Sequence, residues 1–550
     1  MPEPDLKERC IVIPAIKKNA IIPDQLVKKL AGVTLMERAL NTARACASGE
    51  DIITLTDSEE IALICERAGT RFVRNAELRF HSWDIISEMR DLLADLAKSY
   101  KHAILLRPSS PLLTWVDLEN AWKRYNETGA SSLVTVRKVR QRLWRSDRTG
   151  PEELLEEAGS LGEEDFVVET RALIILDLDF LRSVTTTKHK TVPFFLGDRS
   201  LEILDYQDWW ICERLLERRH VVFVVAGYPA IGMGHVYRAL MLAHEITAHK
   251  ITFVCTSRSE LAVESVASRD YHVCRQGNEP LENTVLAQRP DLVINDFLDT
   301  SAEYMAALQD GHTRCVNFED SGPGSARADL VINALYDASL STQRFRCGPE
   351  YFCLRDEFVH AKRNPLRQQV HTLLITFGGT DQHNTTARVL NIVEPVCRAY
   401  GIAIRIVAGP GYSHRQALEE HLARLENPLI TFTWATNIMS RMMEGADLAI
   451  CSAGRTVYEL AHMRVPGLVL ATHEREAGHG FARPRNGFAF AGIMDRISDN
   501  RIRNMFLAML RQKRRSLYWE RQNRLSFAGN KQRVVGLMMD QLEKTEKCLE

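Results

Sequence analysis

The sequence lacks an excess of charge of either sign. Its 70 lysine and arginine residues are balanced by 71 aspartate and glutamate residues, which gives a net charge of -1. Proteins that hold nucleic acid or anionic membranes by electrostatic attraction carry a basic surplus or a strongly basic patch. We therefore expect no nucleic-acid or membrane partner, and we expect any phosphate group to be bound at a local site.

Long apolar runs and paired cysteines are also absent. No uncharged apolar stretch reaches about 18 residues, the length that a membrane-spanning helix needs. The first residues, Met1–Cys10, are polar and carry charges of both signs, unlike a signal peptide. The 12 cysteines contain no Cys-x-x-Cys pair. This spacing is typical of buried free thiols in a reducing cytoplasm, and not of zinc sites or disulfide frameworks.

The remaining composition is that of a folded protein. Apolar residues make up 45% of the chain and charged residues 26%, which is enough apolar surface for buried cores. A length of 550 residues corresponds to about three to four domains.

Short apolar runs alternate with amphipathic stretches along most of the chain. In the first part we expect strands at 10–15, 51–55, 103–106 and 172–176, and helices at 35–46, 59–68, 116–127 and 209–219. This alternation is typical of βαβ units and a parallel sheet. An acidic, loop-like insert is expected around Glu152–Asp165.

The alternation restarts twice, which divides the chain into three α/β units. A strand expected at 221–226 begins the second unit, and one expected at 372–377 begins the third. We predict domains at 1–218, 219–365 and 366–550, the last ending in charge-rich helices. The basic cluster Arg511–Arg515 in these helices is interpreted as a solvated helix face.

The most specific motif is Gly232–Arg238, which reads Gly-Met-Gly-His-Val-Tyr-Arg between an expected strand and an expected helix. Glycines let a ligand approach the backbone closely, and a helix N-terminus favours an anion. Histidine is the side chain whose ordinary pKa lies nearest neutral pH, so His235 at this rim is suited to act as a general base. The alternative interpretation is an ordinary tight turn.

Two later turns also place small residues between a strand and a helix. One is Phe377–Asp381, and the other is Ser452–Glu459. A helix start of this kind can hold a diphosphate on its backbone amides, while a glutamate one turn further binds ribose hydroxyls. The candidate binding residues are Gly378, Gly379, Thr380, Ser452, Ala453, Gly454, Thr456 and Glu459.

In this order and spacing, the three motifs resemble the hydrolase family of pseudaminic acid synthesis. That family releases UDP from UDP-2,4-diacetamido-2,4,6-trideoxy-β-L-altropyranose and has the GT-B fold of two Rossmann-like halves. The resemblance covers residues from about 221 to 500. Further runs that carry it are Leu292–Asp296, Asn317–Asp320, Asp329–Asn333 and Gly348–Phe358.

The resemblance implies a role for each motif. His235 falls on the family's general base, which activates a water for attack on the anomeric carbon, with inversion and without a metal or other cofactor. Gly232, Gly234, Arg238 and Asp296 are expected around the substrate. Where the family commonly carries Asn-Gln, this chain has His473-Glu474. A UDP-sugar glycosyltransferase remains the alternative, because the fold alone does not separate the two activities.

Residues from 10 to about 216 are similar to the CMP-sialic acid synthetases, a cytidylyltransferase family that is commonly dimeric. The similar runs are Ile13–Ala15, Leu30–Gly32, Leu55–Ala62, Leu105–Leu112 and Ser200–Ile203. The resemblance implies a Rossmann-like nucleotidyltransferase domain of the GT-A type. Such a domain transfers CMP from CTP to a nonulosonic acid and uses Mg²⁺.

The phosphate loop of that family is altered in this chain. The family has a Gly-Ser-Lys-Gly loop that cradles the CTP triphosphate, and here the segment reads Ile16–Ile21. Lys17 and Lys18 are left to neutralise phosphate or to serve as surface lysines. The resemblance adds Arg107 and Ser109 as further candidates for binding CTP.

The family's metal and sugar sites are altered as well. Two aspartates hold Mg²⁺ in the family, and here Glu202 takes the first place and Leu204 the second, with Asp205 adjacent. Thr170-Arg171 replaces an Asn-Gly pair that reads the sugar. The domain is either a cytidylyltransferase with Mg²⁺ at Glu202 and Asp205 or a degenerate domain that binds a sugar or nucleotide.

These observations together predict a bifunctional cytoplasmic enzyme of nonulosonic acid synthesis. The fold class is α/β, with the nucleotidyltransferase-like domain followed by the two-Rossmann module. The expected ligands are a UDP-sugar in the second part, and CTP with a nonulosonic acid in the first. Mg²⁺ is expected only if the first domain is active.

Overall fold

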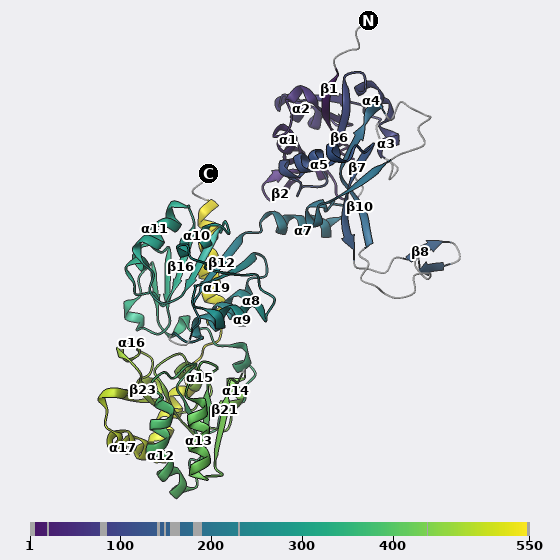
Figure 1. Cartoon of the computed structure of the whole chain (residues 1–550). Helices are drawn as coiled ribbons and strands as arrows, with labels where there is room; N and C mark the ends of the chain where they lie inside the picture. The colour runs from purple at the N-terminus through teal and green to yellow at the C-terminus, as the bar shows by residue number, and fades with distance from the viewer. Residues whose placement is uncertain are drawn as a thin grey trace. The chain divides into compact units, whose positions relative to one another are not determined.

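The computed structural model describes residues 6–18, 21–77, 85–139, 144–147, 150–153, 166–179, 190–228, 231–436 and 438–546. The chain forms two compact units, Met1–Arg218 and Arg219–Glu550 (Figure 1). Each unit is described by itself.

The first unit is built on one seven-stranded sheet in the order β11-β7-β10-β6-β1-β4-β5. Strand β1 pairs in parallel with β4 and β6, while β10 runs antiparallel to both β6 and β7. The main strands are β1 (Lys7–Ala15), β4 (Ile52–Thr56), β5 (Arg71–Arg74), β6 (Tyr100–Leu106), β7 (Ser132–Val139), β10 (Phe166–Asp177) and β11 (Thr191–Phe195). Two short hairpins add β2 (Lys29–Leu30) with β3 (Val33–Thr34), and β8 (Trp144–Asp147) with β9 (Gly150–Glu153).

The helices of this unit follow the expected βαβ rhythm. They are α1 (Leu35–Arg44), α2 (Glu59–Arg67), α3 (Ile85–Glu88), α4 (Arg90–Leu96), α5 (Trp115–Thr128) and α7 (Tyr206–Leu216). Helix α1 shows why they form where they do. Thr34 and Glu37 make a reciprocal capping box at its start, which satisfies two otherwise unpaired backbone N–H groups. Most of the acidic insert expected at 152–165 lies outside the described residues.

The second unit contains two Rossmann-like halves. The first half has a fully parallel sheet in the order β14-β13-β12-β15-β16-β17-β18. Its strands are β12 (His220–Val225), β13 (Lys250–Cys255), β14 (Val273–Arg275), β15 (Leu292–Asp296), β16 (Arg314–Phe318), β17 (Leu330–Asn333) and β18 (Phe345–Cys347). Its helices are α8 (Gly234–Glu245), α9 (Glu260–Ala267), α10 (Leu281–Leu286) and α11 (Ala302–Asp310).

The second half repeats this plan with a parallel sheet in the order β21-β20-β19-β22-β23-β24. The strands are β19 (Thr372–Thr376), β20 (Ala403–Ala408), β21 (Ile430–Trp434), β22 (Leu448–Ser452), β23 (Gly467–Ala471) and β24 (Phe488–Ile493). The helices are α12 (Thr385–Tyr400), α13 (Arg415–Leu425), α14 (Met439–Met443), α15 (Thr456–His462), α16 (Glu474–Ala477), α17 (Asp499–Leu510), α18 (Gln512–Asn523) and α19 (Asn530–Glu546).

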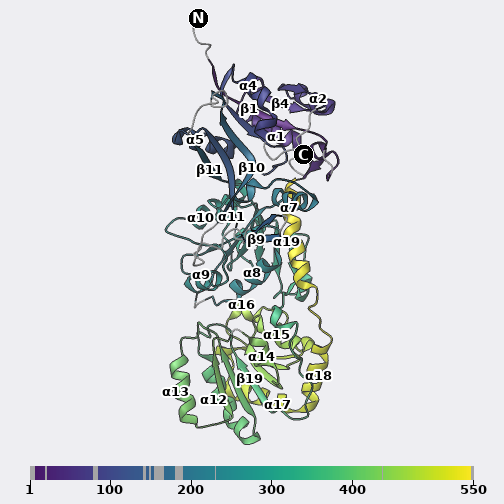
Figure 2. The ribbon, with the colours of Figure 1, turned by 90° about the vertical axis from the view of Figure 1, so that its right-hand side faces the viewer.

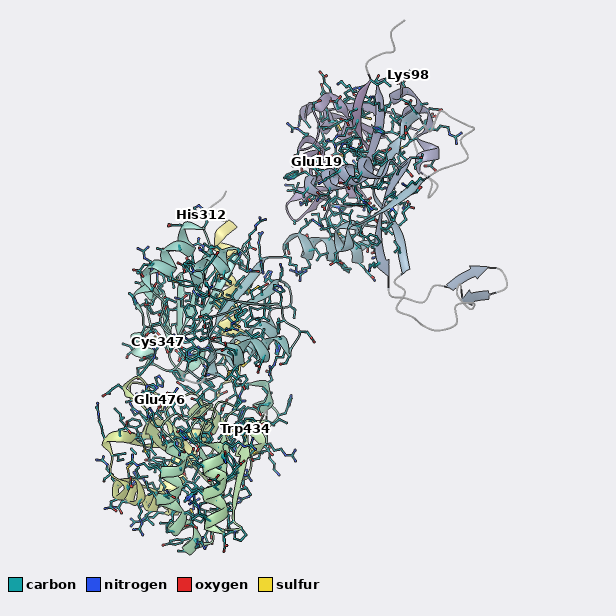
Figure 3. The ribbon with its side chains drawn as sticks, viewed as in Figure 1. Lys98, Glu119, His312, Cys347, Trp434 and Glu476 are labelled. Atoms are coloured by element: carbon teal, nitrogen blue, oxygen red, sulfur yellow. The ribbon has the colours of Figure 1, made fainter. Side chains whose placement is uncertain are left out.

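The strand orders fix where a ligand can bind. In each half the order reverses beside the first strand, between β12 and β15 in one and between β19 and β22 in the other. Open parallel sheets bind ligands outside the carboxyl ends of the strands at such a reversal. Figure 3 labels Cys347, at the end of β18, and Glu476 in α16, which lie where the two halves face each other.

The last helix does not belong to the half that precedes it. We expected 366–550 to form one domain, but α19 buries Val534, Met538 and Leu542 in the core around β12 and α8. Figure 2 shows this helix, in yellow, beside α8 and apart from α17. An apolar stripe on α19 therefore packs against the first half, although the two preceding helices, α17 and α18, pack in the second half.

The basic cluster in α18 also differs from its expected state. Arg515 is 1% exposed, and its guanidinium donates to the carbonyl oxygens of Arg367 (2.9 Å) and Gln368 (2.6 Å). The interpretation of Arg511–Arg515 as a solvated face is therefore wrong at this position. The buried arginine holds the segment that leads into β19.

Two expected absences can be compared with the described chain. No helix in the described ranges has the length and apolarity that crossing a membrane requires. The 11 cysteines within these ranges are all free thiols, and most of them are buried.

Candidate functional site

His235 lies in the first turn of α8 and is held by a carboxylate. Its Nδ1 is 2.6 Å from Oδ1 of Asp296, at the carboxyl end of β15. Because a carboxylate only accepts, this contact places the imidazole proton on Nδ1 and leaves Nε2 as an acceptor. Among the described residues Nε2 has no hydrogen-bond partner, so it is the free basic atom of the site.

Arg238, one turn further along α8, ties Asp296 to a second carboxylate. Its Nε and Nη2 donate to the two oxygens of Asp296, at 2.7 and 2.5 Å. Its Nη1 donates to Glu319, which follows β16. The side chains of Arg238 and Asp296 are 3% and 0% exposed. Arg238 was expected beside the substrate, and in the structure it organises the carboxylates around His235.

The electrostatics of this cluster follow from burial and charge together. Burial alone would raise the pKa of the Glu319 carboxyl, but the charges of Arg238 and Arg455 outweigh it and hold that pKa well below its usual range. Burial likewise opposes the charge on Arg238, yet Asp296 and Glu319 raise its pKa. Glu319 and Arg238 are therefore both charged, although their side chains are almost completely buried.

A cavity of about 350 Å³ lies between the two halves beside this cluster. The first half contributes the Gly232–Gly234 turn and Arg238, and the second contributes Thr376–His383 and most of the Ser452–Glu459 segment. His235 and Asp296 are outside the set of described residues that line the cavity. They adjoin it through Gly234 and Arg238.

The glycine turns face each other across this cavity. Gly232 and Gly378 both have a φ of 82°, a conformation that side-chain-bearing residues rarely adopt. A Cβ on Gly379 would stand 3.7 Å from the backbone nitrogen of Met233, and one on Gly234 would stand 3.4 Å from Cδ of Arg455. The second glycine of the Gly-x-Gly-His motif thus leaves room for an arginine of the other half.

The turn after β19 is arranged differently from the expected phosphate loop. Asp381 accepts from the backbone N–H groups of Thr385 and Thr386, both at 2.8 Å, and so caps α12. The amides at the start of α12 are therefore already satisfied by a carboxylate. Gly378, Gly379 and Thr380 still line the cavity.

The segment after β22 supplies the other wall. Ser452, Gly454, Thr456 and Glu459 line the cavity, while Ala453 is fully buried behind it. Glu459, expected to bind a ribose, accepts from Nε of Arg355 at 2.8 Å. The burial of Arg355 is outweighed by Glu459, so its pKa is raised.

His473 and Glu474 stand where the resembling family carries Asn-Gln. His473 lines the cavity and caps α16 by accepting from the backbone N–H of Glu476 at 3.4 Å. Glu474 points to an exposed ion pair with Arg496, 2.5 Å away. Of the two substitutions, only His473 can touch a ligand in this cavity.

In the first unit, Lys17 is already engaged by carboxylates. Its ammonium lies 2.6 Å from Glu60 and 3.3 Å from Asp24. The hydrogen bond to Glu60 raises the pKa of Lys17. Lys18 is exposed, and residues 19 and 20 of the altered loop lie outside the described residues.

Glu202 is enclosed by cations and a hydroxyl. Ser109 donates to its Oε1 at 3.0 Å, and Arg107 and Arg171 lie 3.2 Å from its two oxygens. Arg171 has a φ of 52° at an irregularity of β10, the backbone conformation that a glycine adopts most easily. An arginine thus occupies a backbone conformation that favours glycine, and its guanidinium forms an ion pair with Glu202.

These residues do not fit a Mg²⁺ site. Mg²⁺ needs several oxygen ligands in octahedral geometry, but the charge of Glu202 is compensated by two guanidiniums. Asp205 caps α7 by accepting from the backbone N–H groups of Gln207 and Asp208, at 2.8 and 3.1 Å. Within the described ranges, no group of three or more His, Cys, Asp or Glu side chains is arranged to hold a metal ion.

No protein-family model matches the chain. It is 28% identical over 273 residues to the uncharacterized protein MJ1062 of Methanocaldococcus jannaschii, covering 46% of this chain and 56% of that protein. It is 27% identical over 269 residues to the spore coat polysaccharide biosynthesis protein SpsG of Bacillus subtilis, covering 46% of this chain and 78% of SpsG. The chain therefore spans little more than half the length of the archaeal relative.

Two solved structures are similar in fold to parts of the chain. MurG of Acinetobacter baumannii, 15% identical, matches 58% of this chain and 99% of its own with a TM-score of 0.42. A CMP:2-keto-3-deoxy-manno-octonic acid synthetase complexed with CTP, 10% identical, matches 38% and 99% with a TM-score of 0.31. Because these scores are low, the fold assignment rests on the strand orders of this chain: a mixed α/β domain followed by a module of two Rossmann-like halves.

Sequence reasoning missed three charged residues of the site. Glu319 contacts the predicted Arg238, Arg355 contacts the predicted Glu459, and Arg455 contacts Glu319, across separations of 81 to 136 positions. Their partners are set by tertiary structure, so no local pattern marks them. All three stand inside runs that the sequence singled out, Asn317–Asp320, Gly348–Phe358 and Ser452–Glu459, but nothing within those runs distinguishes them as site residues.

Proposed function

We propose that the second unit hydrolyses a UDP-linked 2,4-diacetamido-2,4,6-trideoxyhexose to the free sugar and UDP. The observation that carries this proposal is the Asp296–His235 pair, which leaves Nε2 without a partner among the described residues and adjoins, through Gly234 and Arg238, a cavity lined by three small-residue turns. A general base of this kind needs a free nitrogen and a fixed tautomer, and Asp296 supplies the second.

In the proposed reaction His235 acts on water. Nε2 takes one proton from the water while its oxygen forms a bond to the anomeric carbon. The bond between that carbon and the diphosphate oxygen breaks, and its electron pair leaves with UDP. Asp296 stabilises the imidazolium that results. The Ser452–Thr456 turn and the Gly378–Gly379 turn are proposed to hold the diphosphate, and Glu459 the ribose.

A role in sugar biosynthesis has support from one relative. The Bacillus subtilis protein SpsG takes its name from spore coat polysaccharide biosynthesis. The proposal for this chain is narrower, because it specifies the anomeric C–O bond of a UDP-sugar.

The test is UDP release from UDP-2,4-diacetamido-2,4,6-trideoxyhexoses of several configurations. His235→Ala is expected to lower kcat about a hundredfold or more while UDP still binds. His421→Ala, in α13 and outside the cavity, is the matched control and should keep full activity. If His235→Ala releases UDP at the wild-type rate, His235 is not the base and the hydrolase proposal fails.

A glycosyltransferase is the second candidate, and one observation favours it. A second cavity of about 210 Å³ adjoins the first and shares Tyr237, Met241, Arg355 and Thr436 with it. Such a space is suited to an acceptor sugar. In the same assay, UDP release that requires an added acceptor would identify a transferase, and release in water alone would identify a hydrolase.

For the first unit, we infer a degenerate cytidylyltransferase domain. The inference is supported by the two arginines on Glu202, the use of Asp205 as a helix cap and the ion pairs of Lys17. The expected ligand class is a sugar or nucleotide bound without Mg²⁺. The alternative, transfer of CMP from CTP to a nonulosonic acid, would appear as pyrophosphate release that depends on Mg²⁺.

A further inference from the structure

One buried chain of ionic contacts links the two halves of the second unit. Arg455, in the turn after β22, donates from Nη1 to Oε1 of Glu319 at 3.1 Å. Glu319 also accepts from Arg238, Arg238 holds both oxygens of Asp296, and Asp296 holds His235. This series of contacts therefore extends from Arg455, at the wall of the cavity, to His235, the residue proposed as the base.

Arg455 stands at the cavity end of this chain with unused donors. Its Nε and Nη2 make no hydrogen bond to any residue that the structure describes, and Arg455 lines the cavity. Its guanidinium lies over the ring of Phe352, 4.9 Å from the centroid, and its stem fits beside Gly234. This is a positioned cation with one side facing the proposed diphosphate site.

The negative charges of the carboxylates in this series of contacts equal the positive charges of the guanidiniums. Two carboxylates, Asp296 and Glu319, face two guanidiniums, Arg238 and Arg455, and the imidazole adds a proton only when it acts. Side-chain exposures are 10% or less for all of them except Arg455, at 21%. Because these charges are little screened, a carboxylate shared by two guanidiniums binds one of them more strongly when the other is withdrawn.

We propose that Arg455 binds the diphosphate of the UDP-sugar and that this contact, passed through Glu319 and Arg238, sets the strength of the Asp296–His235 pair. The proposal rests on the function proposed above and adds Arg455 as a binding residue and Glu319 as a positioning residue. Phosphate oxygens compete with Glu319 for Arg455. Arg238 is then the remaining guanidinium partner of Glu319, and the hydrogen bonds from Arg238 to Asp296 weaken.

The proposed rearrangement changes the base strength of the His235 imidazole. As Arg238 shifts toward Glu319, more of the charge on Asp296 is left for His235, and His235 becomes a stronger base. The charged groups that face His235 are Arg238 from α8, Asp296 from β15, Glu319 after β16 and Arg455 from the other half. Binding and proton uptake are then coupled, and the coupling is reciprocal.

This coupling can be measured by binding alone, without turnover. The probe is UDP-glucose, whose diphosphate carries fixed charge near neutral pH. Calorimetric titration in buffers of different ionisation enthalpy gives both its affinity and the protons taken up. The wild-type chain should bind UDP-glucose with partial proton uptake near pH 7, and His235→Asn should bind it without that uptake.

Variants separate the two steps of the proposal. Arg455→Ala should weaken UDP-glucose binding about tenfold or more, because a charged hydrogen bond is lost, and Arg455→Lys should restore part of the affinity. Glu319→Gln removes the carboxylate that competes with phosphate for Arg455, so it should bind UDP-glucose at least as tightly as the wild type but without proton uptake. Arg485→Gln, which breaks an exposed ion pair to Asp337 between the same halves, is the matched control and should change neither quantity.

The outcomes are distinguishable. Unchanged affinity in Arg455→Ala would overturn the role of Arg455, and unchanged proton uptake in Glu319→Gln would overturn the relay, while the proposed function would stand in both cases. A wild-type chain that fails to bind UDP-glucose would overturn the proposal and the proposed function together.

Discussion

Glu319 is the residue on which the charge balance of the site depends. Its carboxylate accepts from Arg238 in its own half and from Arg455 in the other, and its side chain is 10% exposed. A buried carboxylate with two guanidinium partners stabilises the folded state only while it is ionised. Protonation removes that stabilisation and leaves two arginines with one fewer counter-charge.

The stability of the chain should therefore fall with acid in a way that depends on this residue. The pKa of Glu319 is held well below its usual range in the folded state, and an unfolded glutamate titrates at about 4.3. Its contribution is present above the unfolded value and is lost as the pH falls toward the folded one. Glu319→Gln should lower the free energy of unfolding by about 3 kcal/mol near neutral pH.

Urea unfolding from about pH 7 to about pH 3 checks this expectation. The gap between the wild type and Glu319→Gln should be constant down to about pH 5 and then narrow. Glu279→Gln, at an exposed glutamate, should follow the wild type throughout. A gap that widens in acid would contradict the assignment of Glu319 as an ionised partner.

At the scale of elements, α19 stabilises a core far from it in sequence. Val534, Met538 and Leu542 join the cluster formed by β12, β13 and α8. Asn530 at its start donates to the carbonyl oxygens of Pro349 and Phe352, which also belong to the segment between the halves. The helix therefore completes the first half although it is the last element of the chain.

Substitutions on the two faces of α19 should have opposite effects. Met538→Ala should destabilise the second unit by about 2–4 kcal/mol, because it opens a cavity in a fully buried position. Gly536→Ala should stabilise it by about 0.5–1 kcal/mol, because Gly536 is exposed and its added Cβ meets nothing within 4 Å. Denaturant titration measures both, and equal effects of the two substitutions would show that α19 does not pack as described.

The sequence predicted the positions of helices and strands better than it predicted what each element or side chain packs against. Buried runs such as 221–226 and 372–377 were correctly assigned as strands, because parallel strands covered on both faces are nearly continuous in apolar residues. The destination of α19 could not be predicted, because its apolar stripe fits either half. Arg515 was misjudged because a buried guanidinium bonded to carbonyl oxygens has the same local sequence as an exposed one.

The candidate site shows the same division. His235 and Asp296 carry local signals, a Gly-x-Gly-His turn and an acid at the end of a strand, and the structure brings them together. The roles proposed for Gly378 and Gly379 also follow from a local turn. Arg107 follows β6 and Arg171 lies in β10, so only the fold reveals that the predicted metal ligand is neutralised.

At the scale of the whole molecule, the chain is two compact units with different predicted ligands. Ligand binding stabilises only the unit that binds, by an amount that rises with concentration. UDP should therefore raise the midpoint of one thermal transition and leave the other unchanged. At a hundred times its dissociation constant, the ligand adds about 2.7 kcal/mol to the stability of that unit.

Scanning calorimetry of the full chain tests this prediction. The transition of the second unit is identified as the one that Met538→Ala lowers, and UDP should raise that transition. Adding Mg²⁺ should not change the effect of CTP on either transition, because Glu202 and Asp205 are already engaged. A shift of the other transition by CTP that requires Mg²⁺ would show that the first unit retains its metal-dependent site.

The return of α19 to the first half also limits how that module can move. The polypeptide passes between the halves twice, once between β18 and β19 and again between α18 and α19. Two bodies joined at one point can swing in any direction, whereas bodies joined at two points turn about the line through both. The second crossing therefore restricts the relative motion of the two halves to rotation about one line. Any opening of the cleft is therefore expected to be a rotation about that line, which would part Arg455 from Glu319 and bring the same two residues back together.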